Sequence, residues 1–215
     1  MKSSTLKFYL IPITVLILGT IMYFMGYFQM IFAALIVLIA SALEYGKGLF
    51  ASMGFQRAKR KAFDLLVVAP LLAAVIFFAY LYLLIPGVTY LTGAPMDFSA
   101  FEVYKGDLPA ILTLTLFAWV SAAFGEEIVF RGYLMRQFVK FFGDGKLALV
   151  LNILIFGVLF GFLHAYQGIS GQIITGIIGM LLATIFYLRK YDLWFCIALH
   201  GFIDTIAMVF IYYGI

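Results

Sequence analysis

The chain contains 215 residues, of which 66% are apolar and only 11% are charged, and its formal net charge is +4. Soluble domains are about 45–50% apolar and about 25% charged, so this composition excludes a water-soluble globule. The abundance of large apolar side chains also excludes a disordered chain. The apolar runs are continuous rather than alternating in polarity, which argues against a membrane β-barrel. We therefore predict an all-α polytopic membrane protein.

Seven apolar runs approach the length of about 20 residues that a membrane-spanning helix requires. They are residues 8–25, 28–45, 65–85, 109–128, 147–166, 171–188 and 192–214. A break in one long run would add an eighth, so we expect seven to eight transmembrane helices in a single membrane domain, 1–215. Residues 1–108 would supply the N-terminal helices and an outer loop. Residues 109–214, with the last four helices, would form the catalytic core.

Lysine and arginine are concentrated in alternate connections between these helices. Thirteen of the 14 cations precede the first helix or fall in every second connection, and only Lys105 lies on the opposite side. Because cytoplasmic connections are enriched in these residues, the pattern places the N-terminus in the cytoplasm of a multi-pass protein. A compact chain of this kind fits a prokaryotic plasma membrane. The cations thus indicate topology, and we expect the lipid bilayer as a partner and no nucleic acid.

Two connections have distinctive compositions. Residues 86–108 are rich in proline, glycine and aspartate, which predicts a long outer loop. Residues 46–64 are basic and include Phe50, Met53 and Phe55. This mixture fits a helix that lies on the anionic cytoplasmic surface, and it fits a loop that sets the topology equally well.

Two adjacent glutamates stand at the end of a largely apolar stretch, Gly-Glu-Glu-Ile-Val-Phe-Arg, at residues 125–131. Ionisable groups in the hydrocarbon region are costly and commonly functional. Glu127 and Arg131 have the i, i+4 spacing and the order that favour an ion pair, whereas Glu126 points about 100° away around the helix. We interpret Glu127 and Arg131 as a structural pair and Glu126 as the carboxylate available for chemistry. The alternative is that both glutamates merely mark a polar boundary.

The two histidines of the chain also lie in apolar runs. His164 ends one run, while His200 and Asp204 share a face of the last helix, where Gly201 would let another backbone approach closely. Each histidine could instead be structural, and a His200–Asp204 bond could simply fix packing. As an alternative to that, Asp204 could accept a hydrogen bond from His200 and hold its tautomer.

The distances of Glu126 and His164 from the turn between their helices predict that the two residues lie at the same depth in the membrane. The turn at residues 143–146 lies about 18 residues after Glu126 and about 20 before His164, so an antiparallel hairpin brings both to nearly the same height. His200 is ten residues past Lys190, closer to the cytoplasmic boundary. All three can meet if the hairpin tip projects into the cytosol. The site would then lie at moderate depth and be reached from the cytoplasmic side.

Three spaced motifs together resemble those of the CPBP family, the CAAX proteases and bacteriocin-processing enzymes also called the ABI family. The motifs are Glu126-Glu127-x-x-x-Arg131, Phe160-x-x-x-His164 and His200-x-x-x-Asp204. They occur in the order of the family, and the resemblance covers residues 109–214. It implies an eight-helix intramembrane endopeptidase whose site opens toward the cytoplasmic half of the bilayer.

The resemblance also implies roles for individual residues. Glu126 matches the essential glutamate, His164 the histidine that helps it activate water, and His200 the histidine of the oxyanion site. Glu127, Arg131 and Phe160 would support them. The last motif position is often asparagine in prenyl-processing eukaryotic members, and Asp204 departs from it. An ionised Asp204 would repel a developing oxyanion.

The same four polar residues allow two kinds of chemistry. Peptide hydrolysis needs a water, a base and donors for the oxyanion, which Glu126, His164 and His200 with Asp204 could supply. Alternatively, all four could bind zinc, although the His-Glu-x-x-His motif is absent. We favour metal-free hydrolysis of a peptide or lipidated protein substrate. A non-catalytic bacteriocin-immunity or membrane-binding protein is the alternative, and a transporter, which would commonly show an internal repeat, is a weaker one.

Overall fold

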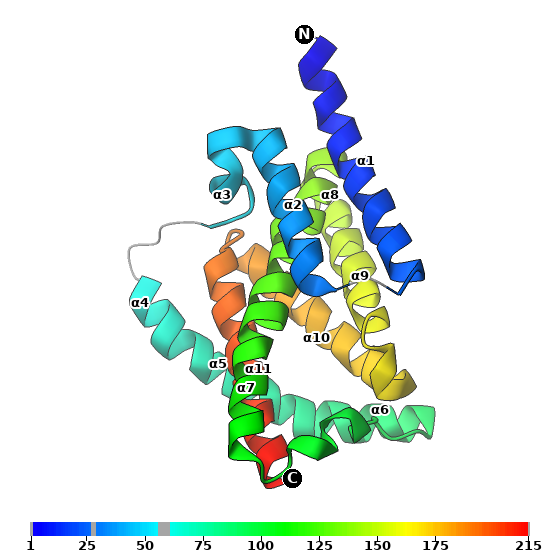
Figure 1. Ribbon diagram of the computed structural model, residues 1–215, viewed down its shortest axis with the longest axis vertical. Coiled ribbons are helices and arrows are strands. Elements are labelled where there is room, and N and C mark those ends of the chain that lie inside the picture. The colour runs from blue at the N-terminus through cyan, green and yellow to red at the C-terminus, as the bar shows by residue number, and fades with distance from the viewer. Residues whose placement is uncertain (1, 27–28, 56–60, 215) are drawn as a thin grey trace.

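The computed structural model describes residues 2–26, 29–55 and 61–214, and these residues form helices and no β-strand (Figure 1). The α-helices are α1 (Lys2–Phe24), α2 (Met30–Tyr45), α3 (Leu49–Ser52), α4 (Lys61–Phe63), α5 (Ala69–Ala79), α6 (Ile85–Thr92), α7 (Leu108–Ala118), α8 (Met135–Phe142), α9 (Lys146–Phe162), α10 (Gly168–Leu188) and α11 (Leu193–Tyr213). The 3₁₀ turns are η1 (Gly46–Gly48), η4 (Ser99–Tyr104) and η7 (Ala165–Gln167). The π-helical segments are η2 (Asp64–Val68), η3 (Tyr80–Leu84), η5 (Trp119–Glu126) and η6 (Ile128–Leu134).

Several of these elements join into stretches that could cross a membrane. Within the described residues, five stretches are long and apolar enough: Met30–Ser52, Lys61–Thr92, Leu108–Phe142, Ala165–Leu188 and Leu193–Tyr213. Two shorter apolar helices, Phe8–Phe24 and Lys146–Phe162, accompany them. Each of the seven apolar runs of the sequence overlaps one of these stretches. The prediction of an all-α membrane protein is therefore confirmed.

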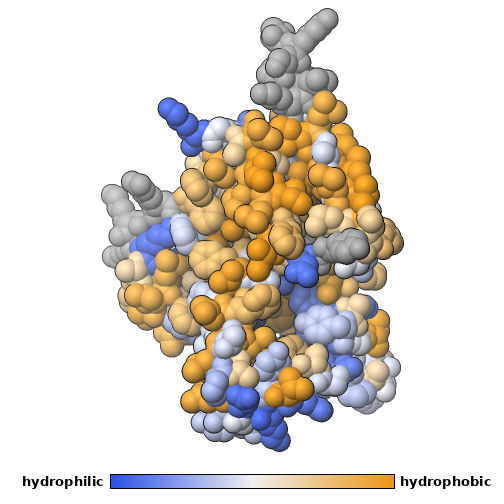
Figure 2. Space-filling view, viewed as in Figure 1, coloured by the Kyte–Doolittle hydropathy of each residue, from blue (hydrophilic) through white to orange (hydrophobic). Residues whose placement is uncertain are grey.

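Large apolar side chains cover the outside of the helices, where a soluble protein would carry polar ones. Leu66, Leu71 and Leu116 are 71%, 65% and 68% exposed. Figure 2 shows such side chains over most of one face, with hydrophilic residues gathered toward the lower end. Apolar area of this extent marks an interaction surface, and lipid chains would cover it in a membrane.

The stretch Lys61–Thr92 corrects the expected start of the outer loop. Residues 86–92 are helical, although Pro86 and Gly87 suggested a break. Proline lacks the N–H that an α-helix needs, and the π-helical segment η3 directly before α6 changes the backbone register there. Gly93, with φ of 68°, ends α6 in the left-handed conformation. The connection is therefore limited to residues 93–107, which include η4.

The basic segment 46–64 is only partly described. It begins with η1 and α3 and returns to helix at α4, while residues 56–60 lie outside the described residues. Its described part packs on the turn after α10: the carbonyl of Gly54 accepts a hydrogen bond from the Leu193 N–H at 2.9 Å. Whether the segment is a surface helix or a topology-setting loop stays a prediction.

The cation-bearing helix ends meet at one end of the molecule. Arg136 Nε donates to the carbonyl of Ser52 at 2.9 Å, and its guanidinium lies 4.4 Å from the centre of the Tyr191 ring. Arg189 pairs with Asp64 at 2.7 Å. These contacts join the ends of α3, α8 and α10 to η2. Arg136 and Arg189, which are far apart in the sequence, thus lie at one end of the bundle, which we call the basic end.

The opposite end is built from connections that contain few cations. The Asp97 N–H donates to the carbonyl of Gln167, and the Gly106 N–H donates to the carbonyl of Tyr212, both at 3.0 Å. The segment between α6 and α7 therefore lies against the α9–α10 turn and the end of α11. Its charged residues are Asp97, Glu102, Lys105 and Asp107. We call this end the acidic end.

Candidate active site

The glutamate pair lies within the long stretch Leu108–Phe142, between two π-helical segments. Glu126 is the last residue of η5, and Glu127 separates it from η6. Segments of π-helix are rare and frequently occur at functional sites. Helical geometry still sends the two neighbouring side chains in different directions, so each meets a different set of partners.

Glu127 is the centre of a buried polar network. Its Oε1 atom accepts hydrogen bonds from Arg131 Nη1 and from His200 Nδ1, both at 2.9 Å. Arg131 Nη2 also donates to the carbonyl of Gly179 at 2.7 Å. The expected Glu127–Arg131 ion pair is therefore present, with side chains that are 0% and 2% exposed. The bond to His200 was not predicted, and it joins this pair to α11.

His200 presents its two ring nitrogens to different carboxylates. Because a carboxylate oxygen only accepts, Nδ1 must carry the proton of its bond to Glu127. The other nitrogen, Nε2, lies 3.6 Å from Asp204 Oδ2 and 4.0 Å from Glu126 Oε2. The hydrogen bond that fixes the tautomer of His200 is therefore the one that Nδ1 donates to Glu127. The expected orienting bond to Asp204 is not formed, because Asp204 Oδ2 lies 3.6 Å from Nε2, on the other side of the ring.

Glu126 and Asp204 keep buried oxygens that lack a hydrogen-bond partner among the described residues. Oε2 of Glu126 and Oδ2 of Asp204 are both in this state, and so is Oε2 of Glu127, whose other oxygen accepts two hydrogen bonds. Buried polar atoms are normally paired, so three unpaired carboxylate oxygens around one histidine require an explanation. A water or a substrate group that enters the space between them would supply the missing partners.

His164 lies just after the end of α9, and its side chain bonds to the backbone of Phe160, the other residue of its motif. Its Nδ1 donates to the carbonyl of Phe160 at 2.9 Å, because a carbonyl only accepts, and its ring centre lies 4.9 Å from that of Phe160. Nε2 is then left for another partner. Phe160 also contacts His200, with ring centres 6.2 Å apart, and lies 5.0 Å from the Arg131 guanidinium. Phe160 therefore contacts one polar side chain from each of the three motifs: Arg131, His164 and His200.

All four candidate catalytic residues line one cavity of about 330 Å³. The helix of Glu126, the end of α9 and the face of α11 with His200 and Asp204 each contribute to its wall. The structure thus brings together the residues that the sequence singled out. Sequence reasoning missed Tyr166 and Gln167, which also line the cavity and are joined by a hydrogen bond from Gln167 Nε2 to the tyrosine oxygen at 3.2 Å. No motif marks these two residues.

The cavity extends along the bundle from the candidate catalytic residues. The α8–α9 turn does reach farther toward the basic end than the α10–α11 turn, as Figure 1 shows. However, the cavity wall includes Met96, Phe98, Phe101 and Tyr166, which belong to the acidic end. The cavity therefore extends from the candidate catalytic residues toward the acidic end, and the expected approach from the cytoplasmic side stays a prediction.

Gly201 brings α11 close to the glutamate helix. A Cβ atom at this position would lie 2.5 to 2.6 Å from three ring carbons of Trp119. The same indole donates from Nε1 to Thr205 Oγ1 at 3.0 Å. The close approach inferred from the sequence is therefore made to an aromatic ring rather than to a backbone. It sets the distance between Glu126 and the residues of α11.

The described side chains, as they stand, contain no group of three or more His, Cys, Asp and Glu residues arranged to hold a metal ion. Whether zinc binds to Glu126, His164, His200 and Asp204 stays a prediction. The reaction steps below therefore use only the residues of the chain.

Comparisons with known proteins agree with the motifs. Residues 108–206 match a family model described as type II CAAX prenyl endopeptidase Rce1-like. Searches of curated proteins and of solved structures gave no match. The matched family is one of CAAX proteases, so the match supports a protease. The motif-bearing part of the chain, residues 108–206, is therefore similar to the Rce1-like CAAX proteases of the CPBP family.

Proposed function

We propose that this protein is an intramembrane endopeptidase of the plasma membrane that hydrolyses a peptide bond in a membrane-associated protein or peptide. The observation that carries this proposal is the carboxylate of Glu126, which is buried with an unpartnered oxygen in a cavity shared with both histidines. A structural glutamate is normally hydrogen-bonded to its neighbours, as Glu127 is through Oε1, whereas none of the hydrogen bonds among the described residues involves Glu126. Glu126 instead keeps an acceptor for a water.

The reaction follows from these positions. Glu126 takes a proton from a water, and the hydroxide adds to the carbonyl carbon of the substrate. His164, whose Nε2 is not used in its bond to Phe160, accepts a hydrogen bond from the same water and aims it. The carbonyl oxygen becomes an oxyanion, and His200 donates to it from Nε2 when that atom carries a proton.

Collapse of the tetrahedral intermediate completes the reaction. The bond between carbon and nitrogen breaks, and the proton held by Glu126 passes to the leaving amine, which restores the carboxylate. Asp204 lies beside His200 Nε2 and stabilises the charged imidazole. Its negative charge also disfavours an oxyanion, so we assign it a positioning role near the histidine.

The direct test compares two carboxylate substitutions in the intact chain. Glu126→Gln removes the base, whereas Asp144→Asn changes an exposed carboxylate in the α8–α9 turn. Mass spectrometry of membranes from expressing cells would map the peptide termini that the protein generates. We expect termini with the parent and with Asp144→Asn that are lost with Glu126→Gln, at equal protein levels. Unchanged termini with Glu126→Gln would contradict the proposal.

The melting temperature of Glu126→Gln distinguishes loss of the catalytic base from loss of the folded structure. Oε2 of Glu126 has no hydrogen-bond partner among the described residues, so replacing the carboxylate with an amide should leave the melting temperature in detergent unchanged or raise it. Loss of cleavage together with a lowered melting temperature would instead assign Glu126 a structural role.

A further inference from the structure

The motif residues supply a single hydrogen-bond donor to the oxyanion. His200 can donate only from Nε2, since its Nδ1 proton is used in the bond to Glu127. Asp204, the other polar residue beside Nε2, has oxygens that only accept when it is ionised. Loss of one donor from an oxyanion site typically costs about 10²–10³-fold in rate, so each donor matters. A further donor in the cavity wall would therefore contribute strongly to the reaction.

Tyr166 lies in the short turn that follows His164. The Gln167 N–H donates to the His164 carbonyl at 2.9 Å and closes the 3₁₀ turn η7 around the tyrosine. Gly168 then has a φ of 73°, which favours glycine, and begins α10. The rings of Tyr166 and His164 have centres 5.9 Å apart. The turn thus places the tyrosine against the histidine that is proposed to aim the water.

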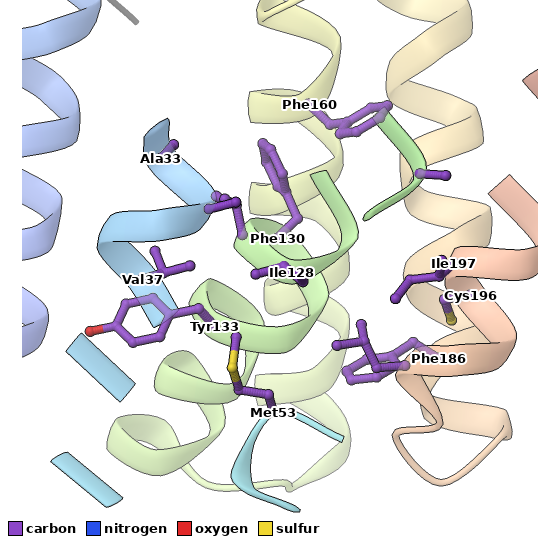
Figure 3. Close-up of a cluster of buried hydrophobic side chains, with 14 of the residues drawn as sticks. Ala33, Val37, Met53, Ile128, Phe130, Tyr133, Phe160, Phe186, Cys196 and Ile197 are labelled. Carbon is purple, nitrogen blue, oxygen red and sulfur yellow. The ribbon is translucent and has the colours of Figure 1, made fainter. Parts of the chain in front are cut away.

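The ends of this turn are attached to neighbouring elements. Phe160, one helical turn before His164, packs edge-on against Phe130 of the glutamate helix, with ring centres 5.2 Å apart (Figure 3). After the tyrosine, the carbonyl of Gln167 accepts a hydrogen bond from the Asp97 N–H at 3.0 Å. These contacts hold the turn, and with it the tyrosine, in place relative to the glutamate helix.

The Tyr166 hydroxyl keeps its proton for another group. Gln167 Nε2 donates to the phenolic oxygen at 3.2 Å, so this oxygen is the acceptor of the bond. None of the hydrogen bonds among the described residues uses the phenolic proton. Tyr166 lines the cavity, and the carboxylates that act electrostatically on its hydroxyl are those of Glu126 and Asp204. The side chain is 54% exposed, so a substrate in the cavity can reach it.

We propose that Tyr166 is a further catalytic residue, whose O–H donates a hydrogen bond to the oxyanion alongside Nε2 of His200. This role rests on the proposed function, because it concerns the same hydrolysis. The proton stays on the tyrosine throughout, and its hydrogen bond strengthens as negative charge develops on the carbonyl oxygen of the substrate. A neutral donor also offsets the unfavourable charge of Asp204.

Kinetics on a peptide with a mapped cleavage site test the role of the hydroxyl. The peptide would span a terminus that the parent generates and that Glu126→Gln loses. We expect Tyr166→Phe to lower kcat by roughly 10²-fold with KM nearly unchanged, because the bond forms in the transition state. Tyr80→Phe is the matched control, since Tyr80 lines the same cavity but its hydroxyl donates to the Met96 sulfur at 3.5 Å. An equal kcat for the two variants would overturn the proposal.

A second comparison separates the phenolic proton from the hydrogen bond to Gln167. Gln167→Met removes that bond but keeps the proton, so kcat should stay close to that of the parent. Tyr166→Phe combined with Gln167→Met removes both partners and avoids an unpaired buried amide, should the single variant fold poorly. Its kcat should match that of Tyr166→Phe. A loss as large in Gln167→Met alone would overturn the proposal.

Asp204→Asn tests where the proton is donated. The amide can donate, and it would stand where Asp204 Oδ2 lies 3.6 Å from His200 Nε2. In the Tyr166→Phe background this donor should raise kcat about tenfold, a partial replacement of the lost one. A double variant no faster than Tyr166→Phe would overturn the donor role. Cleavage of the peptide by Glu126→Gln would contradict the proposed function, whereas undiminished cleavage by Tyr166→Phe contradicts only the role of Tyr166.

Discussion

His200 Nδ1 lies 2.9 Å from Oε1 of Glu127, the same oxygen that accepts the hydrogen bond of Arg131. One carboxylate oxygen therefore connects the last helix to the glutamate helix, and through Arg131 to the carbonyl of Gly179 on α10. The second glutamate of the motif is thus more than a partner for arginine. It fixes the orientation of the histidine that faces Glu126.

We expect Glu127→Gln to lower both stability and cleavage. Loss of one partner of a buried ion pair typically costs about 3–5 kcal/mol, because the remaining charge is uncompensated. Differential scanning fluorimetry in detergent and mapping of peptide termini would measure the two effects.

A double variant separates positioning from folding at the same site. Glu127→Leu with Arg131→Leu removes both charges, and we expect it to recover much of the melting temperature but not cleavage, because His200 still lacks its acceptor. Restored cleavage in the double variant would show that Glu127 serves only the fold.

Asp204 is tested by two substitutions that differ in polarity. Asp204→Asn keeps the shape and an acceptor beside His200, so measurable cleavage should remain. Asp204→Ala removes the polar group, and cleavage should fall by roughly 10²-fold, the scale seen for an oxyanion-hole donor. If Asp204 ligated zinc, both variants would be nearly inactive. Cleavage that survives equally in both variants, at equal protein levels, would show that Asp204 is only a packing residue.

Gly201→Ala should disturb the distance between α11 and the glutamate helix. The added Cβ would overlap the Trp119 ring, and overpacking of this kind costs typically 1–3 kcal/mol. Gly87→Ala is the matched control, because a Cβ there meets nothing within 4 Å. We expect a lower melting temperature and less cleavage only for Gly201→Ala. Replacement of Trp119 by Phe in the same chain should recover part of the loss, and a lack of any difference between the two glycines would contradict this account.

Removal of metal ions should leave cleavage intact. Both a zinc mechanism and a metal-free mechanism require Glu126, His164 and His200, so alanine substitutions of these residues do not distinguish the two mechanisms. Metal analysis of the purified active protein does. About one zinc per chain, with cleavage lost to a chelator and restored by zinc, would overturn the metal-free mechanism.

Local patterns could be predicted from the sequence, and contacts between distant residues could not. The Glu127–Arg131 pair follows from i, i+4 spacing, and the helices follow from the length of the apolar runs. The bond between Glu127 and His200 joins residues 73 positions apart, for which no spacing rule exists. The π-helical segment η5 and the Trp119 ring over Gly201 also depend on tertiary packing. Level arguments place residues along an axis without showing how a cavity extends, so the reach of the cavity to Met96 and Tyr166 could not be predicted.

The Glu127 network also affects how the protein is synthesised. Glu127 precedes His200 by 73 residues, and Arg131 precedes Gly179 by 48. At about 5–20 residues per second, the ribosome needs roughly 4–15 s to supply the histidine after the glutamate. During that interval the Glu127–Arg131 ion pair lacks the hydrogen bond from His200 that it has in the finished fold. A chain that stops before α11 would keep this deficit permanently, which makes such truncated chains targets for membrane quality control.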